Sequence, residues 1–116
     1  MDLYHIWCDL KTGVGDMDFT DKLNAYLGGL ANAGKIESYR ITRRKLGLGR
    51  EGLGEFHIMI DTRDLAQLDQ AFRVVASRAG PVEDNHFSVN SLVENARFAL
   101  YRDFPDEFRE TGEEKF

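Results

Sequence analysis

The chain has 116 residues, and its 15 Lys and Arg stand against 20 Asp and Glu, which gives a formal net charge of −5. Hydrophobic residues make up 42% of the chain and charged residues 30%, a composition that excludes a disordered or collagen-like chain and fits one globular domain. No apolar run approaches the ~20 residues of a membrane span, and we expect no signal peptide. The single cysteine, Cys8, excludes an internal disulfide, so we expect a cytoplasmic protein. Because no apolar run is long enough to span a membrane, we also expect no membrane partner.

The first third of the chain predicts a strand followed by a helix. Residues 3–10 form a short run rich in apolar and aromatic side chains, which favours a strand. After a loop, Asp16 is placed to cap a helix, and Gly34 is placed to end it in the left-handed conformation. Between them, apolar residues recur at helical spacing and predict one buried stripe of Phe19, Leu23, Tyr26, Leu27 and Leu30.

The middle of the chain predicts two strands and a second helix. Residues 36–46 and 55–61 are typical of strands, and they flank a glycine-rich loop. The second of these strands alternates cleanly between apolar and polar residues. Asp64 caps the helix that follows, with Gln67 three residues later as a variant capping box, and residues 80–81 (Gly-Pro) end it.

The residues after Pro81 leave two alternatives for a fourth strand. Residues 87–93 alternate as a strand would, whereas residues 98–101 fit another short strand or a helical turn. We place one domain at residues 1–105 and a charged C-terminal tail at residues 106–116. The resulting order, βαββαβ, predicts an α+β protein of the ferredoxin-like class, with an antiparallel sheet in strand order 4-1-3-2 and two helices on one face.

The alternation of the strands divides their side chains between two faces of the sheet. In each strand the more uniformly apolar set should face the helices, and the other set then lies on an open face that two helices do not cover. The residues expected to share the centre of this open face are His5, Trp7, Arg40, His57 and Met59. Apolar side chains on an open face mark an interface or a ligand site. The simplest cover is a second copy of the chain, which predicts a homodimer.

The element order, the half-apolar open face and the length resemble the dimeric α/β-barrel superfamily. Its members include stress-responsive barrel proteins, antibiotic-biosynthesis-type monooxygenases and haem-degrading monooxygenases. Residues 1–10, 39–49 and 54–60 also resemble a small bacterial family of uncharacterised proteins, over roughly residues 3–106. The resemblance implies a dimeric barrel fold and brings no known activity. The roles of the haem-degrading relatives are not transferred, because the first three predicted strands contain no Asn.

Two motifs favour structural interpretations over functional ones. The spacing Gly47-x-Gly49-x-x-Gly52 matches a dinucleotide fingerprint in its letters, but a strand rather than a helix should follow it, so we interpret it as a hairpin loop. Five cations among residues 40–50 are typical of a charged edge strand or of an anion-binding patch, and we favour the edge strand. We expect no nucleic-acid partner, because the chain is acidic and its central strands lack the aromatic pattern of RNA-binding sheets.

Two of the histidines are the candidates for catalysis. Imidazole suits proton transfer near neutral pH, so His5 and His57 are the candidate catalytic residues. Trp7, Arg40 and Met59 are the candidates for contacting a small anionic or aromatic ligand. We expect no cofactor and no bound metal, although two histidines on neighbouring strands leave a metal site as an alternative.

The leading hypothesis from the sequence is a homodimeric α/β-barrel protein that binds a small ligand. If it is an enzyme, we expect a cofactor-independent monooxygenase- or isomerase-like reaction that uses histidine acid/base chemistry. The alternative is a non-catalytic, stress-related dimerisation module whose open sheet face is only an interface.

Overall fold

The computed structural model describes residues 1–76, 86–105 and 109. Its elements follow the chain as β1 (Asp2–Leu10), α1 (Asp16–Asn32), β2 (Ser38–Arg43), β3 (Phe56–Thr62), α2 (Leu65–Ala76) and β4 (Val93–Arg102). The predicted order and the α+β class are therefore confirmed. The tail predicted at residues 106–116 lies outside the described residues except for Arg109, and it stays a prediction, as does the domain boundary.

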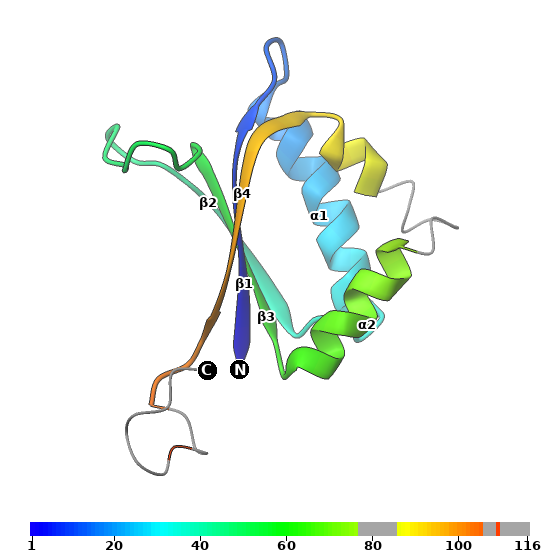
Figure 1. The fold of residues 1–116 in the computed structure, drawn as a ribbon. Helices are drawn as coiled ribbons and strands as arrows, with labels where there is room; N and C mark the ends of the chain where they lie inside the picture. Colours follow the sequence, from blue (N-terminus) through cyan, green and yellow to red (C-terminus); the bar gives the residue numbers. More distant parts are fainter. Residues whose placement is uncertain (77–85, 106–108, 110–116) are drawn as a thin grey trace.

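The four strands form one antiparallel sheet in the order β2-β3-β1-β4, which is the predicted order read from the other edge. Both helices lie on one side of this sheet (Figure 1). The connection between β2 and β3, residues 44–55, extends to the side away from the helices (Figure 1). We call this connection the hairpin arm. β2 is an edge strand, as predicted, and at Ser38–Arg43 it is shorter than the predicted 36–46. Leu46, with a left-handed φ of 58°, lies in a turn of the hairpin arm.

The C-terminal end of α1 follows its prediction. Phe19, Leu23, Leu27 and Leu30 are its buried residues, so the apolar stripe faces the sheet. Gly34 has a φ of 73°. Its N–H donates to the carbonyl of Ala31 at 3.0 Å, and the N–H of Lys35 donates to the carbonyl of Leu30 at 2.9 Å. This pair of bonds is the Schellman motif, which satisfies the last carbonyls of the helix.

The predicted cap at the start of α1 is wrong. The helix begins at Asp16 itself, and Gly15 is the capping residue, which has no side chain to form a hydrogen bond. The carboxylate of Asp16 instead binds the guanidinium of Arg43 on β2 at 2.8 Å. An acidic group in the first turn still interacts favourably with the helix dipole, so the residue type fits although its position is one residue inside the helix.

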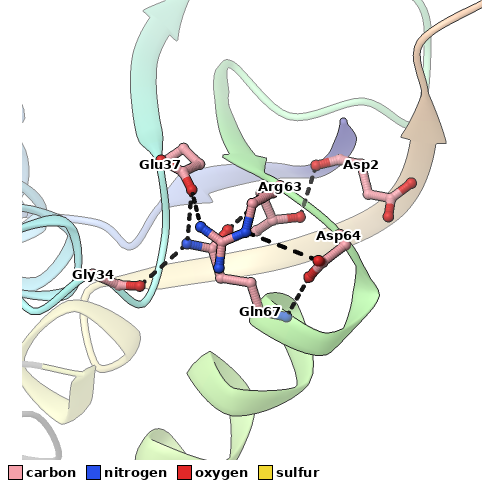
Figure 2. Close-up of polar contacts among 7 residues, drawn as sticks. Asp2, Gly34, Glu37, Arg63, Asp64 and Gln67 are labelled. Atoms are coloured by element: carbon pink, nitrogen blue, oxygen red, sulfur yellow. Dashed lines mark hydrogen bonds and ion pairs between the residues drawn. The ribbon is translucent and has the colours of Figure 1, made fainter.

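A network of side chains holds the first turn of α2 (Figure 2). As predicted, Asp64 caps the helix, and its Oδ1 accepts from the N–H of Gln67 at 2.8 Å. Gln67 accepts in turn from the N–H of Arg63 at 2.7 Å, and its amide nitrogen donates to the carbonyl of Gly34 and to Glu37, each at 3.2 Å. Gln67 is 6% exposed, so these bonds satisfy a buried amide and tie α2 to the segment between α1 and β2.

The fourth strand, β4 (Val93–Arg102), agrees with the second of the two sequence alternatives and not with the first. Residues 86–90 are helical, so the strand predicted at 87–93 is wrong, and β4 contains the alternative at 98–101. Alternation over so few residues does not distinguish a strand from a helical turn. The pairing of β4 with β1 shifts between Trp7 and Asp9, where Asn95 has a φ of 56°. This is a β-bulge, in which one strand contributes an extra residue.

Candidate functional site

Four rings cluster on the open face of the sheet: His5 and Trp7 on β1, His57 on β3 and Tyr101 on β4. We call them the ring cluster. Trp7 lies parallel to His57, with 4.4 Å between ring centroids and 8° between the planes. Tyr101 meets His5 edge-on at 5.1 Å. Tyr101 was not predicted, because the sequence left the position of β4 open.

The two imidazoles of the ring cluster face each other directly. His5 Nδ1 and His57 Nε2 are 2.9 Å apart, which is a hydrogen bond in which one ring donates and the other accepts. Burial, and then the nearby His5, lower the pKa of His57, so its ring is neutral at pH 7. Thr42 on β2 fixes the backbone beside it, because its hydroxyl donates to the carbonyl of His57 at 2.7 Å.

The structure places all five residues predicted for the site on the same face. His5 pairs with Met59 and Trp7 with His57 in the register of β1 and β3. Arg40 lies opposite Met59 on β2. The predicted neighbourhood is therefore confirmed, whereas the ligand-binding and catalytic roles of these residues stay predictions.

The basic segment at residues 40–50 is partly neutralised by its neighbours. Arg43 binds Asp16 at 2.8 Å and Glu55 at 3.1 Å. The hydrogen bond to Arg43 lowers the pKa of Asp16, and the same carboxylates raise the pKa of Arg43. These ion pairs anchor the base of the hairpin arm to α1 and to the start of β3. The glycine spacing lies within this arm and is followed by β3, which confirms the hairpin-loop interpretation.

A cavity of about 200 Å³ lies on the opposite side of the sheet, between the sheet and the helices. We call it the helix-side cavity. Its walls come from the sheet, from α1 and α2 and from the helical residues 86–90, and they are mostly apolar. Ile6, Leu27, Ile58, Ala71 and Phe98 are among the residues that line it. None of the five residues predicted from the sequence lines this cavity.

Four residues that carry polar groups are among those that line the helix-side cavity: Tyr4, Tyr26, His86 and Asn90. The rings of Tyr26 and His86 lie 5.4 Å apart and are tilted by 54°. Burial raises the pKa of Tyr4, so its hydroxyl stays protonated as a donor. None of these four residues was predicted as part of a site. The available signal was weak: a tyrosine in an otherwise apolar strand face and another in an apolar helix stripe.

Cys8 also lines the helix-side cavity, but its thiol is unreactive. Burial, with a further contribution from the charge of Asp9, raises the pKa of Cys8 to about 11. The nucleophile is the thiolate, which is scarce at neutral pH when the pKa is this high. Cys8 therefore serves as a small apolar wall residue.

Two further features are absent from the described ranges. Residues 1–76, 86–105 and 109 contain no group of three or more His, Cys, Asp and Glu that could hold a metal ion. In the same part of the chain, every helix is too short or too polar to cross a membrane.

The antiparallel four-stranded sheet with two helices on one face defines a ferredoxin-like α+β protein. The chain itself belongs to a family of unknown function, DUF6614, whose model matches residues 1–116. The resemblance to an uncharacterised family is thereby confirmed. No curated protein matches the chain in sequence.

Several solved structures share this fold. The protein At3g17210 from Arabidopsis thaliana superposes with a TM-score of 0.71 at 8% identity, over 91% of this chain and 98% of that one. SnoaB, a cofactor-independent oxygenase from Streptomyces nogalater, gives 0.67 at 7% identity, over 93% and 97%. A dimeric ferredoxin-like protein of unknown function from Jannaschia sp. CCS1 gives 0.64 at 16% identity, over 89% and 100%. At these identities the likeness shows the fold alone.

Proposed function

We propose that this protein binds a small, mostly apolar molecule in the helix-side cavity. The observation that supports this most strongly is the cavity of about 200 Å³. Well-packed cores contain few voids larger than a water molecule. An engineered apolar cavity of about 150 Å³ already takes up benzene. A ligand with one ring and a few substituents therefore fits the observed volume.

The polar groups of the cavity narrow the class of ligand. Binding sites for small molecules combine apolar walls with a few polar groups that orient the ligand. Tyr4 carries a protonated hydroxyl, and the lining residues His86 and Asn90 carry an imidazole and an amide. We infer that the ligand is an aromatic or dicarbonyl compound with oxygen substituents that accept or donate hydrogen bonds.

If the protein turns its ligand over, we propose cofactor-independent oxygenase- or isomerase-like chemistry. The likeness of fold to SnoaB and an imidazole at the helix-side cavity support this. His86 is the histidine placed to exchange a proton with a ligand there. His5 and His57 face the other way, and we keep them as the proposed acid/base pair for a ligand held at the open face. His86→Ala and His57→Ala distinguish the two placements, because only one of them should abolish turnover.

Filling the cavity tests the binding proposal. Ala71 is 5% exposed and lines the cavity from α2, so Ala71→Leu places three further carbon atoms inside it. We expect single-ring phenols and diketones to raise the Tm of the native protein and to lose that effect in Ala71→Leu. Ala25→Leu, at an exposed position of α1, is the matched control and should keep it. Equal ligand-induced shifts in all three proteins would overturn the proposal.

We propose as a second function that the open face is the seam of a homodimer. The ring cluster, Leu3 and Met59 place apolar surface on this face, and similar proteins of this fold are described as dimeric. The hairpin arm extends to the same side (Figure 1) and carries Leu46 and Leu48, which are 84% and 79% exposed. Leucines this exposed in a single chain are suited to packing on a partner. We propose that the arm of each copy covers the edge of the other.

The arm allows a test that leaves the single-chain fold intact. Because Leu46 and Leu48 are exposed, Leu46→Asn with Leu48→Ser should cost the fold little, and Asn tolerates the left-handed φ at residue 46. We expect analytical ultracentrifugation to show a dimer for the native protein and a weakened dimer for this variant. Leu65→Ser, at an exposed leucine on α2, should leave the dimer unchanged. A native monomer, or a variant that dimerises as well as the native protein, would contradict the seam.

A further inference from the structure

The hydrogen-bonded histidine pair of the ring cluster joins two neighbouring strands. His5 stands opposite Met59, and Trp7 stands opposite His57, so the two histidines are diagonal neighbours across β1 and β3. His5 Nδ1 and His57 Nε2 are 2.9 Å apart, and both side chains are half-buried. Trp7 stacks on His57, and Tyr101 packs edge-on against His5. The packing therefore keeps two imidazole nitrogens close together.

We propose that His5 and His57 form a two-histidine binding site for a divalent transition-metal ion of the class that prefers imidazole, namely Cu²⁺, Ni²⁺ or Zn²⁺. Metal–imidazole bonds of about 2.0–2.1 Å place two ligand nitrogens about 2.9 Å apart at a right angle and about 3.4 Å apart at a tetrahedral angle. The observed separation of 2.9 Å matches the right angle. Square-planar and octahedral ions have that angle, so the geometry favours Cu²⁺ and Ni²⁺ over Zn²⁺.

Chelation requires only a small rearrangement of the pair. In the hydrogen bond the two nitrogens point at each other, whereas a chelated ion lies to one side of the line between them. Rotation about χ2 redirects both lone pairs, and this torsion is soft in histidine. The ring that donates the hydrogen bond also has to move its proton to its other nitrogen, because the coordinating nitrogen must be unprotonated. This change of tautomer leaves the imidazole neutral, so the ring has no net loss of a proton to solvent.

The surroundings set the expected strength of binding. Arg40 lies beside Met59 and Arg97 lies opposite Trp7 on the same face. Both are exposed in the single chain, where solvent screens their repulsion of a cation. The described residues bring no third His, Cys, Asp or Glu to the pair, and water completes the coordination. We therefore expect micromolar rather than nanomolar affinity.

Trp7 makes the proposal measurable with the metal ion alone. It is the single tryptophan of the chain, and its ring stacks on His57 at 4.4 Å. Cu²⁺ is paramagnetic and quenches an indole in contact with its ligand, whereas closed-shell Zn²⁺ does so weakly. Titration of the full chain with CuSO₄ should give saturable quenching at one ion per chain. Removal of the Cu²⁺ with excess EDTA should restore the fluorescence, whereas Zn²⁺ at the same concentration should displace little of it.

Single substitutions identify the ligands. His5→Gln and His57→Gln keep a hydrogen-bonding side chain and should each weaken Cu²⁺ binding at least about tenfold, since even the loss of an outer partner commonly costs about 10–100-fold. His86→Gln removes the third histidine, which lies at the helix-side cavity, and should leave the Cu²⁺ titration unchanged. Thermal melts of all three variants show whether each one folds.

Electron paramagnetic resonance of the Cu²⁺-loaded native chain gives a second readout that does not depend on a variant folding. We expect nitrogen hyperfine structure from two imidazoles. Quenching that does not saturate, equal affinity in a folded His57→Gln, or a spectrum without nitrogen coupling would each overturn the proposal.

Discussion

Replacing Gly54 by alanine should destabilise the protein strongly, because Gly54 packs against the backbone of β1. A Cβ at residue 54 would lie 2.7 Å from the backbone nitrogen of Cys8 and closer still to its carbonyl group. Comfortable contact between such atoms begins at about 3.5 Å. The start of β3 would therefore have to move away from β1 by close to an ångström, which also loosens the hydrogen bond from the Glu55 N–H to Asp9 at 2.9 Å. Overpacking typically costs about 1–3 kcal/mol, and we expect about 3 kcal/mol because the obstacle is backbone.

Thermal unfolding measures this cost. About 3 kcal/mol corresponds to a fall in Tm of roughly 10 °C or more for a chain of this size. Gly29→Ala is the matched control, because Gly29 is exposed in α1 and a Cβ there meets nothing within 4 Å. Alanine is the better helix former by about 0.5–1 kcal/mol, so this variant should melt a few degrees higher than the native protein. If Gly54→Ala melted within about 2 °C of the native protein, the close packing of Gly54 on β1 would be refuted.

Three further predictions concern single side chains. Because the pKa of His57 is lowered in the folded state, the unfolded chain binds more protons below its ordinary pKa of about 6.5, and the free energy of unfolding should fall as the pH drops below that value. Urea titrations at several pH values should show a shallower fall in His57→Gln, and an identical fall in both proteins would contradict the account. With its pKa raised to about 11, the Cys8 thiol should react with iodoacetamide at pH 8 about a hundredfold more slowly than a free thiol, and complete labelling of the folded protein at the free-thiol rate would disprove its burial. Asp64→Ala removes the bond to the Gln67 N–H and should cost about 1 kcal/mol in chemical denaturation, whereas Asp21→Ala, at an exposed position within α1, should stay within about 0.5 kcal/mol of the native protein.

The order of elements and the division of the sheet into two faces were predictable, because both depend on local periodicity. The period of two in β3 and the helical stripe of α1 are set by where each side chain points, so they are visible in the sequence. The start of α1 was not predictable to the residue. The same sequence pattern, an aspartate just before an apolar stripe, is expected whether the aspartate is the capping residue or lies in the first turn. The contact that Asp16 makes instead is with Arg43, which lies 27 residues away in the chain.

The candidate site was predictable on one face only. The neighbours His5, Trp7, His57 and Met59 follow from the alternation of two central strands once the strand order is known. Tyr101 required the position and the bulge of β4, and short alternating runs do not reveal either. The helix-side cavity had no local signature, because a void depends on what the side chains of several distant elements together fail to fill.

A crystal structure of the protein under xenon pressure tests the central claim most directly, which is that a small ligand binds between the sheet and the helices. Xenon enters apolar cavities without needing polar recognition, so the experiment does not depend on knowing the ligand. The account predicts xenon in the helix-side cavity, beside Leu27, Ile58 and Ala71. A helix-side cavity without xenon, with or without xenon bound at the ring cluster, would contradict it.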